Sequence, residues 1–600
     1  MIIHHTRTSS LVRSVCSLLP STNMKKSILK GVLALTTLGL TMTSCNKFLD
    51  ENPDHTYVEG NSPYIISRFL TYSYPLSSMA YLSELASDNT YEDIDQNSYR
   101  DRFLDEAFHW EDITQRDGAG YFDGPTKIWE QFYYPIAQAN EVLERIKESG
   151  NEGERNLASR GEALALRAWA HFQMANLFCL PYNFDGKGSE TNLGIPYIAE
   201  RVTTLLPDYP RGTLKETYEK VEADLLAAIP LLEKYSPYSE DVKRFHFTAD
   251  AAYAFATRFY LYYNKPEKAK EYADKLLGSN PAASLRDYRA LQAMPLSKSE
   301  QAVKIAEAYC SASADCNLLV QTSVSNAGMA LAPWLTSKRY TLTNYLSETE
   351  LFQSNNIWGT SSNLIWKPFT VNSGESNFAL LMKLPREFEI RNTTTGSGYL
   401  RTLNVDFTMD EALLNRAEAE IMLGQNDAAC ADMTIWMKNF FNTNVTLTPT
   451  SVQTYFKTVS YAYADAAKMV PSFKKHISPR FTIDAEGSVQ ESLLQCLLNF
   501  RRIETVHQGM RWMDIRRYNI EIPRRLIGAN GKPSKNLDWL EKDDPRQVVQ
   551  IPQSIREAGV AGNPTKALVA GAKLVDLSQY KLPVLSAVNQ YSAPVSAHSF

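Results

Sequence analysis

Long apolar runs are scarce in this chain of 600 residues. Residues 31–42 form the one extended run, and they are too few to span a bilayer as a permanent helix. Cysteine is also sparse, and its seven scattered residues cannot supply a disulfide framework. Only Cys310 and Cys316 lie near each other, so whether they form a bridge stays open. Basic residues are concentrated nowhere and the net charge is −5, which argues against nucleic acid as a partner.

The sequence also lacks the common catalytic motifs. It has no HExxH, no GxSxG and no P-loop, and its nine histidines are too scattered to suggest a metal site. Carboxylate pairs such as Asp93 with Asp95 or Glu387 with Glu389 could serve a glycosidase. Such pairs are usually solvated surface, however. We therefore predict that the protein is not an enzyme and keep an α-helical glycoside hydrolase as a minor alternative.

A leader occupies residues 1–44. A basic patch precedes the apolar residues 31–42, which is the layout of a secretory signal. Methionine and two small residues then lead into Cys45, the pattern at which bacterial lipoprotein signal peptidases cut. We therefore predict that Cys45 carries lipid, because two or three acyl chains give stable membrane attachment. The alternative is a plain secretory signal with a chance cysteine, and residues 1–23 resemble an upstream extension.

The body after the leader shows helical periodicity over much of its length. Apolar residues recur at helical spacing over residues 62–87, 128–149, 162–180, 213–235, 248–263 and 489–509. Thr248 is a plausible N-cap for the fifth of these segments. The body contains no second apolar run long enough to cross a membrane. The sequence therefore predicts a mainly α-helical fold.

Two pairs of helices have the spacing of tetratricopeptide (TPR) repeats. The first pair, within residues 241–283, carries the repeat positions Tyr253, Ala256, Thr257, Tyr260, Ala269, Ala273, Leu276 and Pro281. The second pair consists of residues 409–423 and 425–441. It has the same spacing between a small residue in one helix and a small residue in the next, here Ala417 and Ala429. Small residues at these steps let antiparallel helices approach closely. We therefore expect a scaffold of TPR-like hairpins, with an unrelated helical bundle as the alternative.

Between these pairs, residues 284–406 show no sustained helical period. They are rich in Ser, Thr, Asn and Gly, and they hold several aromatic residues, including Tyr345. Loops this long are usually functional or disordered, and the aromatic content argues against disorder. The predicted regions are a leader (1–44), an N-terminal region (45–240), a TPR-like hairpin (241–283), an irregular region (284–406) and a C-terminal region (407–600).

Four stretches of the mature chain resemble the SusD/RagB family of outer-membrane nutrient-binding lipoproteins. They are CNKFLDENPD at residues 45–54, ALALRAWAHFQMANLF at 163–178, DEALLNRAEAEIMLG at 410–424 and RRIETVHQGMRWMDIRRY at 501–518. Within the last stretch, the family's run of conserved types corresponds to Arg502, Glu504, Gly509, Arg511, Asp514 and Arg517. Gln508 departs from the acidic residue usual before the glycine, and the end of the chain lacks the usual family ending.

This resemblance implies a TPR-like helical scaffold with a long, irregular, loop-rich ligand-binding half. It also implies a surface-exposed protein, anchored in the outer membrane through its lipid alone and facing the exterior. Asp50 and Glu51 resemble the acidic export tag of such lipoproteins. The partners implied are a SusC-like TonB-dependent channel and an oligosaccharide or peptide ligand. No cofactor is implied, although some relatives hold a structural calcium ion.

Sugar binding requires flat apolar faces beside hydrogen-bonding groups. Burial of about 100 Å² of apolar area contributes about 2.5 kcal/mol before any costs, so two or three converging rings are needed. In the resembling family these rings come from the loop after the first helix and from the irregular middle. The corresponding candidates here are Tyr91, Tyr99, Trp110, Trp334, Tyr340, Trp358 and Trp366. Each of them could instead be a core residue.

The arginine-rich stretch 501–518 suggests structure rather than catalysis. Arg511 and Asp514 stand at i, i+3 spacing and could pair along a helix, and Gly509 suits a helix C-terminus. A TPR-type adaptor that binds only protein is the remaining alternative function. It would have all of its loop aromatics buried, and its protein binding would survive alanine at Trp334 and Trp358.

Overall fold

The computed structural model describes residues 61–92, 102–114, 122–183, 186–203, 209–296, 299–331, 339–373, 376–462, 471–527 and 533–564. The predicted leader and Cys45 lie outside these residues. The described body is mainly helical, as predicted, and its strands form small sheets.

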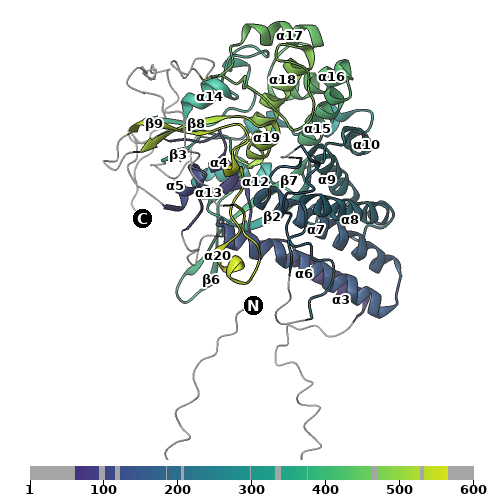
Figure 1. Cartoon of the computed structure of the whole chain (residues 1–600). Coiled ribbons are helices and arrows are strands. Elements are labelled where there is room, and N and C mark those ends of the chain that lie inside the picture. Colours follow the sequence, from purple (N-terminus) through teal and green to yellow (C-terminus); the bar gives the residue numbers. More distant parts are fainter. Residues whose placement is uncertain are drawn as a thin grey trace, which may run out of the picture. The chain divides into compact units, whose positions relative to one another are not determined.

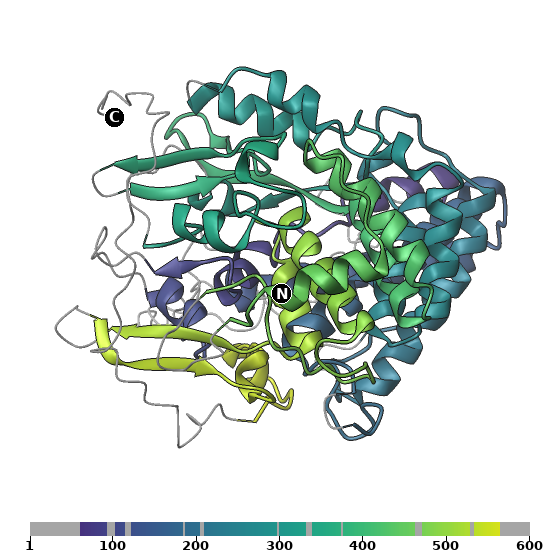
Figure 2. The same ribbon diagram turned by 90° about the horizontal axis from the view of Figure 1, so that it is seen from above.

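Long antiparallel helices form the main array of the body (Figures 1 and 2). They are α6 (Pro125–Ser149), α7 (Glu154–Phe178), α8 (Leu214–Lys234), α9 (Ala249–Tyr262), α10 (Pro266–Leu277), α15 (Met409–Met422), α16 (Asn426–Phe440) and α18 (Val489–Glu504). Each helix from α6 to α10 packs on the next, α10 packs on α15, and α15 packs on both α16 and α18. The array therefore continues across the long insertion between α10 and α15.

Helix α7 lies at the centre of the first part of this array. Its alanines are buried on several faces, so it can pack closely on α6 and α8 at once. Gly161 shows how close this approach is, because a Cβ atom there would lie 2.9 Å from Leu231 Cβ on α8. At the start of α8, Thr213 and Glu216 form a capping box that satisfies free backbone N–H groups. The small residues of α7 and the capping box of α8 together position these two helices against each other.

The two predicted TPR-like hairpins are present as α9–α10 and α15–α16. The Thr248 side chain accepts a hydrogen bond from the backbone N–H of Ala251, which confirms it as the N-cap of α9. Ala256, Ala269 and Ala273 have no exposed surface, as expected for small residues between closely packed helices. The TPR-like scaffold that the spacing predicted is therefore confirmed.

The first predicted helix is wrong in its extent. Residues 62–87 form two helices, α3 (Pro63–Thr71) and α4 (Ala80–Ala86). Pro75 lies between them. Proline lacks a backbone N–H and disfavours helical geometry in the residue before it. The chain therefore turns at this point although its apolar spacing continues.

Residues 284–406 contain regular structure that the absence of a helical period did not reveal. The main sheet has the order β2 (Asn317–Val324), β7 (Ser397–Thr408), β6 (Glu387–Asn392), with both pairs antiparallel. Strand β2 is buried on both faces, so its sequence shows no polar–apolar alternation. There are two further antiparallel hairpins. One pairs β4 (Phe369–Ser373) with β5 (Ser376–Leu380), and the other pairs β8 (Ile522–Ile527) with β9 (Pro533–Leu540).

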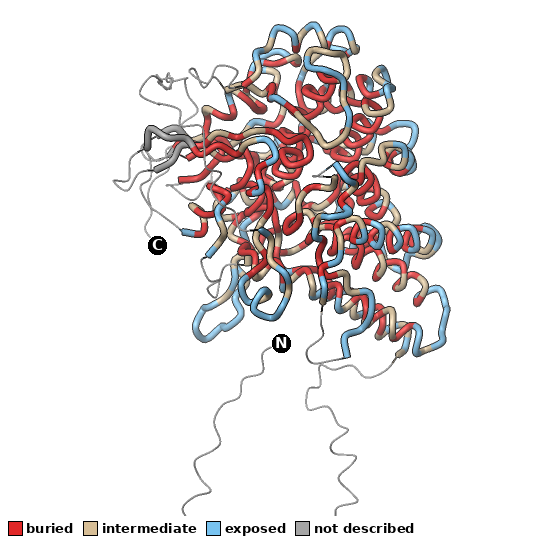
Figure 3. Tube along the Cα trace, viewed as in Figure 1, coloured by how far each residue is buried: buried red, intermediate tan, exposed pale blue. Residues whose placement is uncertain are grey.

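Short helices connect these elements. They are α5 (Arg102–Phe108), α11 (Tyr288–Ala293), α12 (Ser299–Tyr309), α13 (Ala327–Ala330), α14 (Asn344–Glu350), α17 (Pro449–Thr458), α19 (Met510–Tyr518) and α20 (Gln553–Glu557). Buried residues continue from the long helices into the strands and short helices without a break (Figure 3). Cys310 and Cys316 are buried and free, so the bridge left open by the sequence is not formed.

A buried ionic junction joins segments that are far apart in the sequence. The Arg511 guanidinium donates to both oxygens of Asp88 at 2.7 and 2.9 Å. Arg502 donates to the Asp88 backbone carbonyl at 2.6 Å and to Glu350 Oε2 at 2.7 Å. Lys475 also donates to Glu350 Oε2, at 2.8 Å. Although burial disfavours the charged carboxylate, Arg502 and Arg511 hold the pKa of Asp88 well below its usual range.

This junction corrects the predicted pairing within residues 501–518. Arg511 does not pair with Asp514, because its partner is Asp88. The Asp514 carboxylate instead accepts from Arg501 at 3.0 and 3.1 Å and from Arg517 at 3.2 Å. All of these side chains are buried in ion pairs. The structural interpretation of this stretch therefore holds, with different partners.

Gly509 is placed differently from its prediction as a helix C-terminus. It precedes α19 with a φ of 75°, in the left-handed region that favours glycine. A Cβ atom at this position would lie 2.8 Å from Ala80 Cα. The Gly509 N–H donates to Glu84 Oε2 at 3.1 Å. Glycine is therefore needed both for the backbone angle and for contact with α4.

His171 on α7 is a buried, neutral histidine. Its Nδ1–H donates to the Arg167 carbonyl oxygen at 2.8 Å, and its Nε2 accepts from the Ile198 N–H at 3.0 Å. The ring stacks on Tyr197 with a centroid separation of 3.8 Å. Burial lowers the pKa of His171 to about 3. The neutral ring thus joins α7 to the segment that precedes α8.

The first prediction concerns the ionic junction. We expect Asp88→Asn to lower the free energy of unfolding by about 3–5 kcal/mol, because it leaves buried guanidinium groups without their carboxylate. Urea denaturation of the purified body measures this loss. The control is Glu130→Gln, which removes the surface pair of Glu130 and Lys127 and should cost less than about 1 kcal/mol. Equal losses in the two variants would contradict a structural role for the junction.

The second prediction concerns pH. In the unfolded chain His171 takes up a proton near pH 6.5, whereas in the folded protein it does so only near pH 3. Stability should therefore fall as the pH falls between these values, by up to about 1.4 kcal/mol per pH unit from this group. In His171→Gln the dependence of stability on pH should become shallower. Denaturation measured at several pH values between about 3 and 6.5 checks this. His476→Gln, which alters a side chain that is 51% exposed, should keep the original slope; parallel slopes in all three proteins would refute the assignment.

Candidate functional site

A short strand pair brings together two of the predicted ligand-binding segments. Strand β1 (Tyr91–Glu92) pairs antiparallel with β3 (Tyr340–Thr341), so that Tyr91 lies opposite Thr341 and Glu92 opposite Tyr340. The segment after the first helices and the irregular middle therefore meet here, although they are far apart in the sequence. We define the candidate site as the surface around this strand pair and the adjoining helix α14.

Among the described residues of this site, the two rings that keep part of their surface exposed are Tyr91 and Tyr345. Both side chains are half-buried, and their centroids lie 6.5 Å apart with the ring planes inclined at 60°. Tyr345 is at the start of α14, whose N-cap is Thr343. Burial raises the pKa of Tyr345 to about 12, so its hydroxyl stays protonated at neutral pH. Two half-buried aromatic rings with phenolic hydroxyl groups therefore lie next to each other in this site.

Polar side chains accompany Tyr345 on the outer face of α14. Glu348 and Thr349 follow it at i+3 and i+4 spacing, which places all three residues on one side of the helix. Glu348 is exposed, and partial burial raises the pKa of its carboxyl group. A carboxylate beside an aromatic ring can accept hydrogen bonds from hydroxyl groups of a ligand stacked on that ring.

Charged side chains lie behind the strand pair. Arg339 donates to Glu92 Oε1 at 2.7 and 3.0 Å, and its Nε lies 3.7 Å from Asp105 Oδ1. The Tyr340 hydroxyl also donates to Asp105. These contacts connect β1, β3 and α5, and they fix the backbone beneath Tyr91.

The rings of Trp110 and Tyr340 support the site from within. Both are buried, at 3% and 6% exposure, so they offer no open face to a ligand. Tyr340 packs on Phe108 with a centroid separation of 4.4 Å. The Trp110 indole N–H donates to the Ala86 carbonyl oxygen at 2.8 Å, and the Arg524 guanidinium lies over its ring at 4.3 Å.

Two further predicted residues, Trp358 and Trp366, lie in the helical core, each 1% exposed. Trp358 stacks on Phe441 with a centroid separation of 4.1 Å, and Trp366 stacks between Tyr288 and Tyr309. Both rings therefore have protein on their faces, which is the core alternative that the sequence left open. Tyr99 and Trp334 lie outside the described residues.

Sequence reasoning missed Tyr345 and its neighbour Glu348 as candidates. Tyr345 belongs to the same aromatic stretch as Tyr340. The available signal was the helical spacing of Glu348 and Thr349, which stand at i+3 and i+4 from Tyr345. That signal was hidden because α14 is only seven residues long. Arg339 and Asp105 could not be recognised either, since their roles depend on partners from distant segments.

The described residues contain neither a cluster of metal-ligating side chains nor a helix that could span a membrane. No group of three or more His, Cys, Asp or Glu side chains in them is arranged to hold a metal ion. In the same part of the chain, every helix is too short or too polar to cross a bilayer.

Residues 47–261 match the SusD-like family described as starch-binding and associating with the outer membrane. None of the curated proteins matches the chain.

Solved structures share the fold over most of the chain. A SusD superfamily protein from Bacteroides vulgatus is 20% identical, with a TM-score of 0.53 and coverage of 84% of this chain and 99% of its own. A SusD-like carbohydrate binding protein from the same species is 16% identical, with a TM-score of 0.52 and coverage of 88% and 100%. A SusD superfamily protein from Bacteroides thetaiotaomicron is also 16% identical, with a TM-score of 0.52 and coverage of 84% and 98%. Residues 47–261 thus match the SusD-like family model, and the described body shares the fold of SusD superfamily structures.

Proposed function

We propose that this protein is a carbohydrate-binding lipoprotein of the outer membrane that captures oligosaccharides at the surface around β1, β3 and α14. The observation that carries the proposal is the pair of half-buried rings, Tyr91 and Tyr345, next to the polar side chains of Glu348 and Thr349. The family description, starch-binding and associating with the outer membrane, supports the ligand class and the location.

The chemistry of the site suits a sugar. One face of a pyranose consists of C–H groups that pack on an aromatic ring, while its hydroxyl groups need acceptors and donors at the rim. Two partly open rings that each bury about 100 Å² contribute about 5 kcal/mol before the costs of association. The net affinity then falls in the millimolar to micromolar range. Such an affinity permits capture followed by release.

Release would pass the ligand to a SusC-like TonB-dependent channel. A lipid on Cys45 would hold the body at the outer-membrane surface, facing the exterior, close to such a channel. The protein would act without a cofactor, apart from the structural calcium ion that some relatives hold.

Binding without catalysis fits the described residues best. In the candidate site, the carboxylates of Glu92 and Asp105 lie 2.7 and 3.7 Å from the Arg339 guanidinium, which favours a structural role for them. The adaptor alternative expected all loop aromatics to be buried, and Tyr91 and Tyr345 are not. A peptide remains the other ligand class to be included in any binding test.

The third prediction tests the two rings. We expect Tyr345→Ala and Tyr91→Ala each to weaken oligosaccharide binding about tenfold, which corresponds to a loss of about 1.4 kcal/mol of stacking. A glycan and peptide array identifies the ligand, and calorimetric titration of that ligand measures the loss. Tyr72→Ala is the matched control, because Tyr72 is 70% exposed next to α3 and lies outside the site. Unchanged affinity in both site variants would exclude this surface.

The fourth prediction tests the anchor. Metabolic labelling with a radioactive fatty acid should mark the wild-type protein, and Cys45→Ser should remove the label because the acylated thiol is gone. The variant should also leave the membrane fraction, since no other segment of the mature chain is proposed to hold it there. Cys179→Ser, at a buried cysteine of the body, should keep the label. An unlabelled wild-type protein would disprove lipid attachment.

A further inference from the structure

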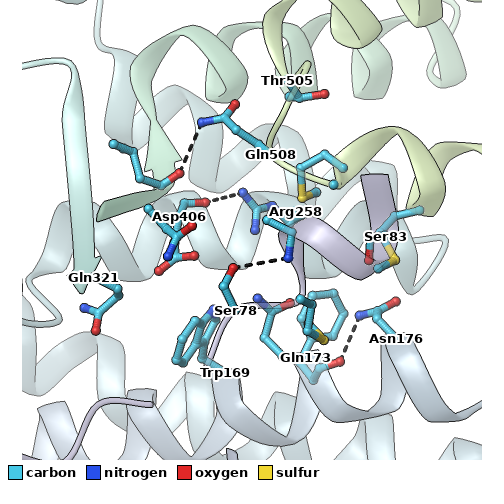
Figure 4. Close-up of a pocket in the computed structure, with 18 of the residues that line it drawn as sticks. Ser78, Ser83, Trp169, Gln173, Asn176, Arg258, Gln321, Asp406, Thr505 and Gln508 are labelled. Carbon is cyan, nitrogen blue, oxygen red and sulfur yellow. Dashed lines mark hydrogen bonds between the residues drawn. The ribbon is translucent and has the colours of Figure 1, made fainter. Parts of the chain in front are cut away.

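A cavity of about 70 Å³ lies in the interior of the body, between the helical array and the β2–β7–β6 sheet. Side chains from α4, α7, α9, β2, β7 and the turn before α19 converge on it (Figure 4). It shares no lining residue with the surface of Tyr91 and Tyr345. The cavity is therefore a separate place in the molecule where a ligand could bind.

Two glutamines face this cavity without a protein partner. Gln173 on α7 and Gln321 on β2 line it, and neither side-chain amide makes a hydrogen bond to any described residue. Gln321 is 7% exposed, so bulk solvent does not supply its partners freely. Each amide offers two N–H donors and one acceptor oxygen. Gln173 is half-buried, whereas a buried amide such as that of Gln321 normally has partners.

Six other lining residues have a buried polar atom with no partner in the described part of the chain. They are Ser77 Oγ, Ser83 Oγ, Trp169 Nε1, Tyr262 Oη, Asn404 Oδ1 and Asp406 Oδ2. A buried polar group without a hydrogen-bond partner destabilises the folded protein. Because so many of these groups surround one cavity, we infer that something in the cavity satisfies part of them.

The cavity offers no free cation. The Arg258 guanidinium is paired with Glu411, with a distance of 2.8 Å between Nε and Oε1, and it also donates to the Asp406 carbonyl oxygen. Burial raises the pKa of the Asp406 carboxyl group to about 7, although Arg258 opposes the shift. The cavity lining thus contains hydrogen-bond donors and acceptors and carries little net charge. Phe132, Phe172 and Met513 supply apolar walls.

The size of the cavity limits what it can hold. At about 10–15 Å³ per water position, it accommodates about five waters. A single sugar ring or a glycerol molecule displaces a comparable number of waters. The lining of hydroxyl, amide and indole groups beside aromatic walls matches the alternating hydroxyl and C–H surfaces of such molecules.

We propose that this cavity binds a small neutral polyhydroxy molecule, between glycerol and a monosaccharide in size, at a site separate from the oligosaccharide surface. Gln173 and Gln321 hydrogen-bond its hydroxyl groups, and Trp169 and Ser83 contribute further polar contacts. The proposal does not depend on the proposed function, because the two sites have no residue in common.

Ligand-observed NMR and calorimetry on the full mature protein test this proposal with glycerol and D-glucose as probes. We expect saturable binding of at least one probe, and density for it in the cavity of soaked crystals. Gln321→Leu and Gln173→Leu should each weaken this binding at least tenfold. Gln553→Leu is the matched control, because Gln553 is exposed on α20 and should leave the affinity unchanged. Tyr345→Ala should also leave it unchanged, whereas it should weaken oligosaccharide binding.

Several outcomes would overturn the proposal. Water alone in the cavity of soaked crystals, with no saturable binding in solution, would show that the polar groups are hydrated only. Density in the crystal without binding in solution would show binding at crystal concentration only. If the leucine variants do not fold, Gln321→Asn and Ser83→Ala replace them, since both keep the surrounding packing. Unchanged affinity in these variants would place the bound probe elsewhere.

Discussion

The structure depends on one buried set of charges, the junction of Asp88, Glu350, Arg502 and Arg511. Asp88 and Arg511 are more than four hundred residues apart in the sequence, yet they form a two-point ion pair in the core. Each charge there would be strongly destabilising alone, so the members are stable only together. The junction therefore requires that α4, α14, α18 and α19 assemble in one arrangement.

The same junction positions the candidate site. Asp88 precedes Tyr91 by three residues, and Glu350 follows Tyr345 by five residues at the other end of α14. Because Arg502 binds both Asp88 and Glu350, a single side chain from α18 fixes the two segments that carry the open rings. A ring pair held in this way needs little reordering on binding, which favours affinity by reducing its entropic cost. The buried charges thus shape the surface that carries the proposed binding site.

Sequence predicted the helical array well where periodicity was sustained. The helices expected over 128–149, 213–235 and 248–263 correspond to α6, α8 and α9, because each buries one stripe against its neighbours. Prediction failed where a tertiary contact outweighed the local pattern. Strand β2 is buried on both faces and so lacks alternation. Arg511 likewise has a local candidate partner in Asp514, but Asp88 offers a two-point contact in the core.

The candidate site was predictable only in part, for a related reason. Aromatic content located the two segments that meet at β1 and β3, but it could not tell which rings have an open face. That property depends on what covers each ring, and the covering residue usually comes from elsewhere in the chain. Trp358 is covered by Phe441, whereas Tyr345 meets Tyr91 with the ring planes inclined at 60° and is only half-buried. Ring exposure is therefore a long-range property, and in this protein it follows from the way the buried charges bring the segments together.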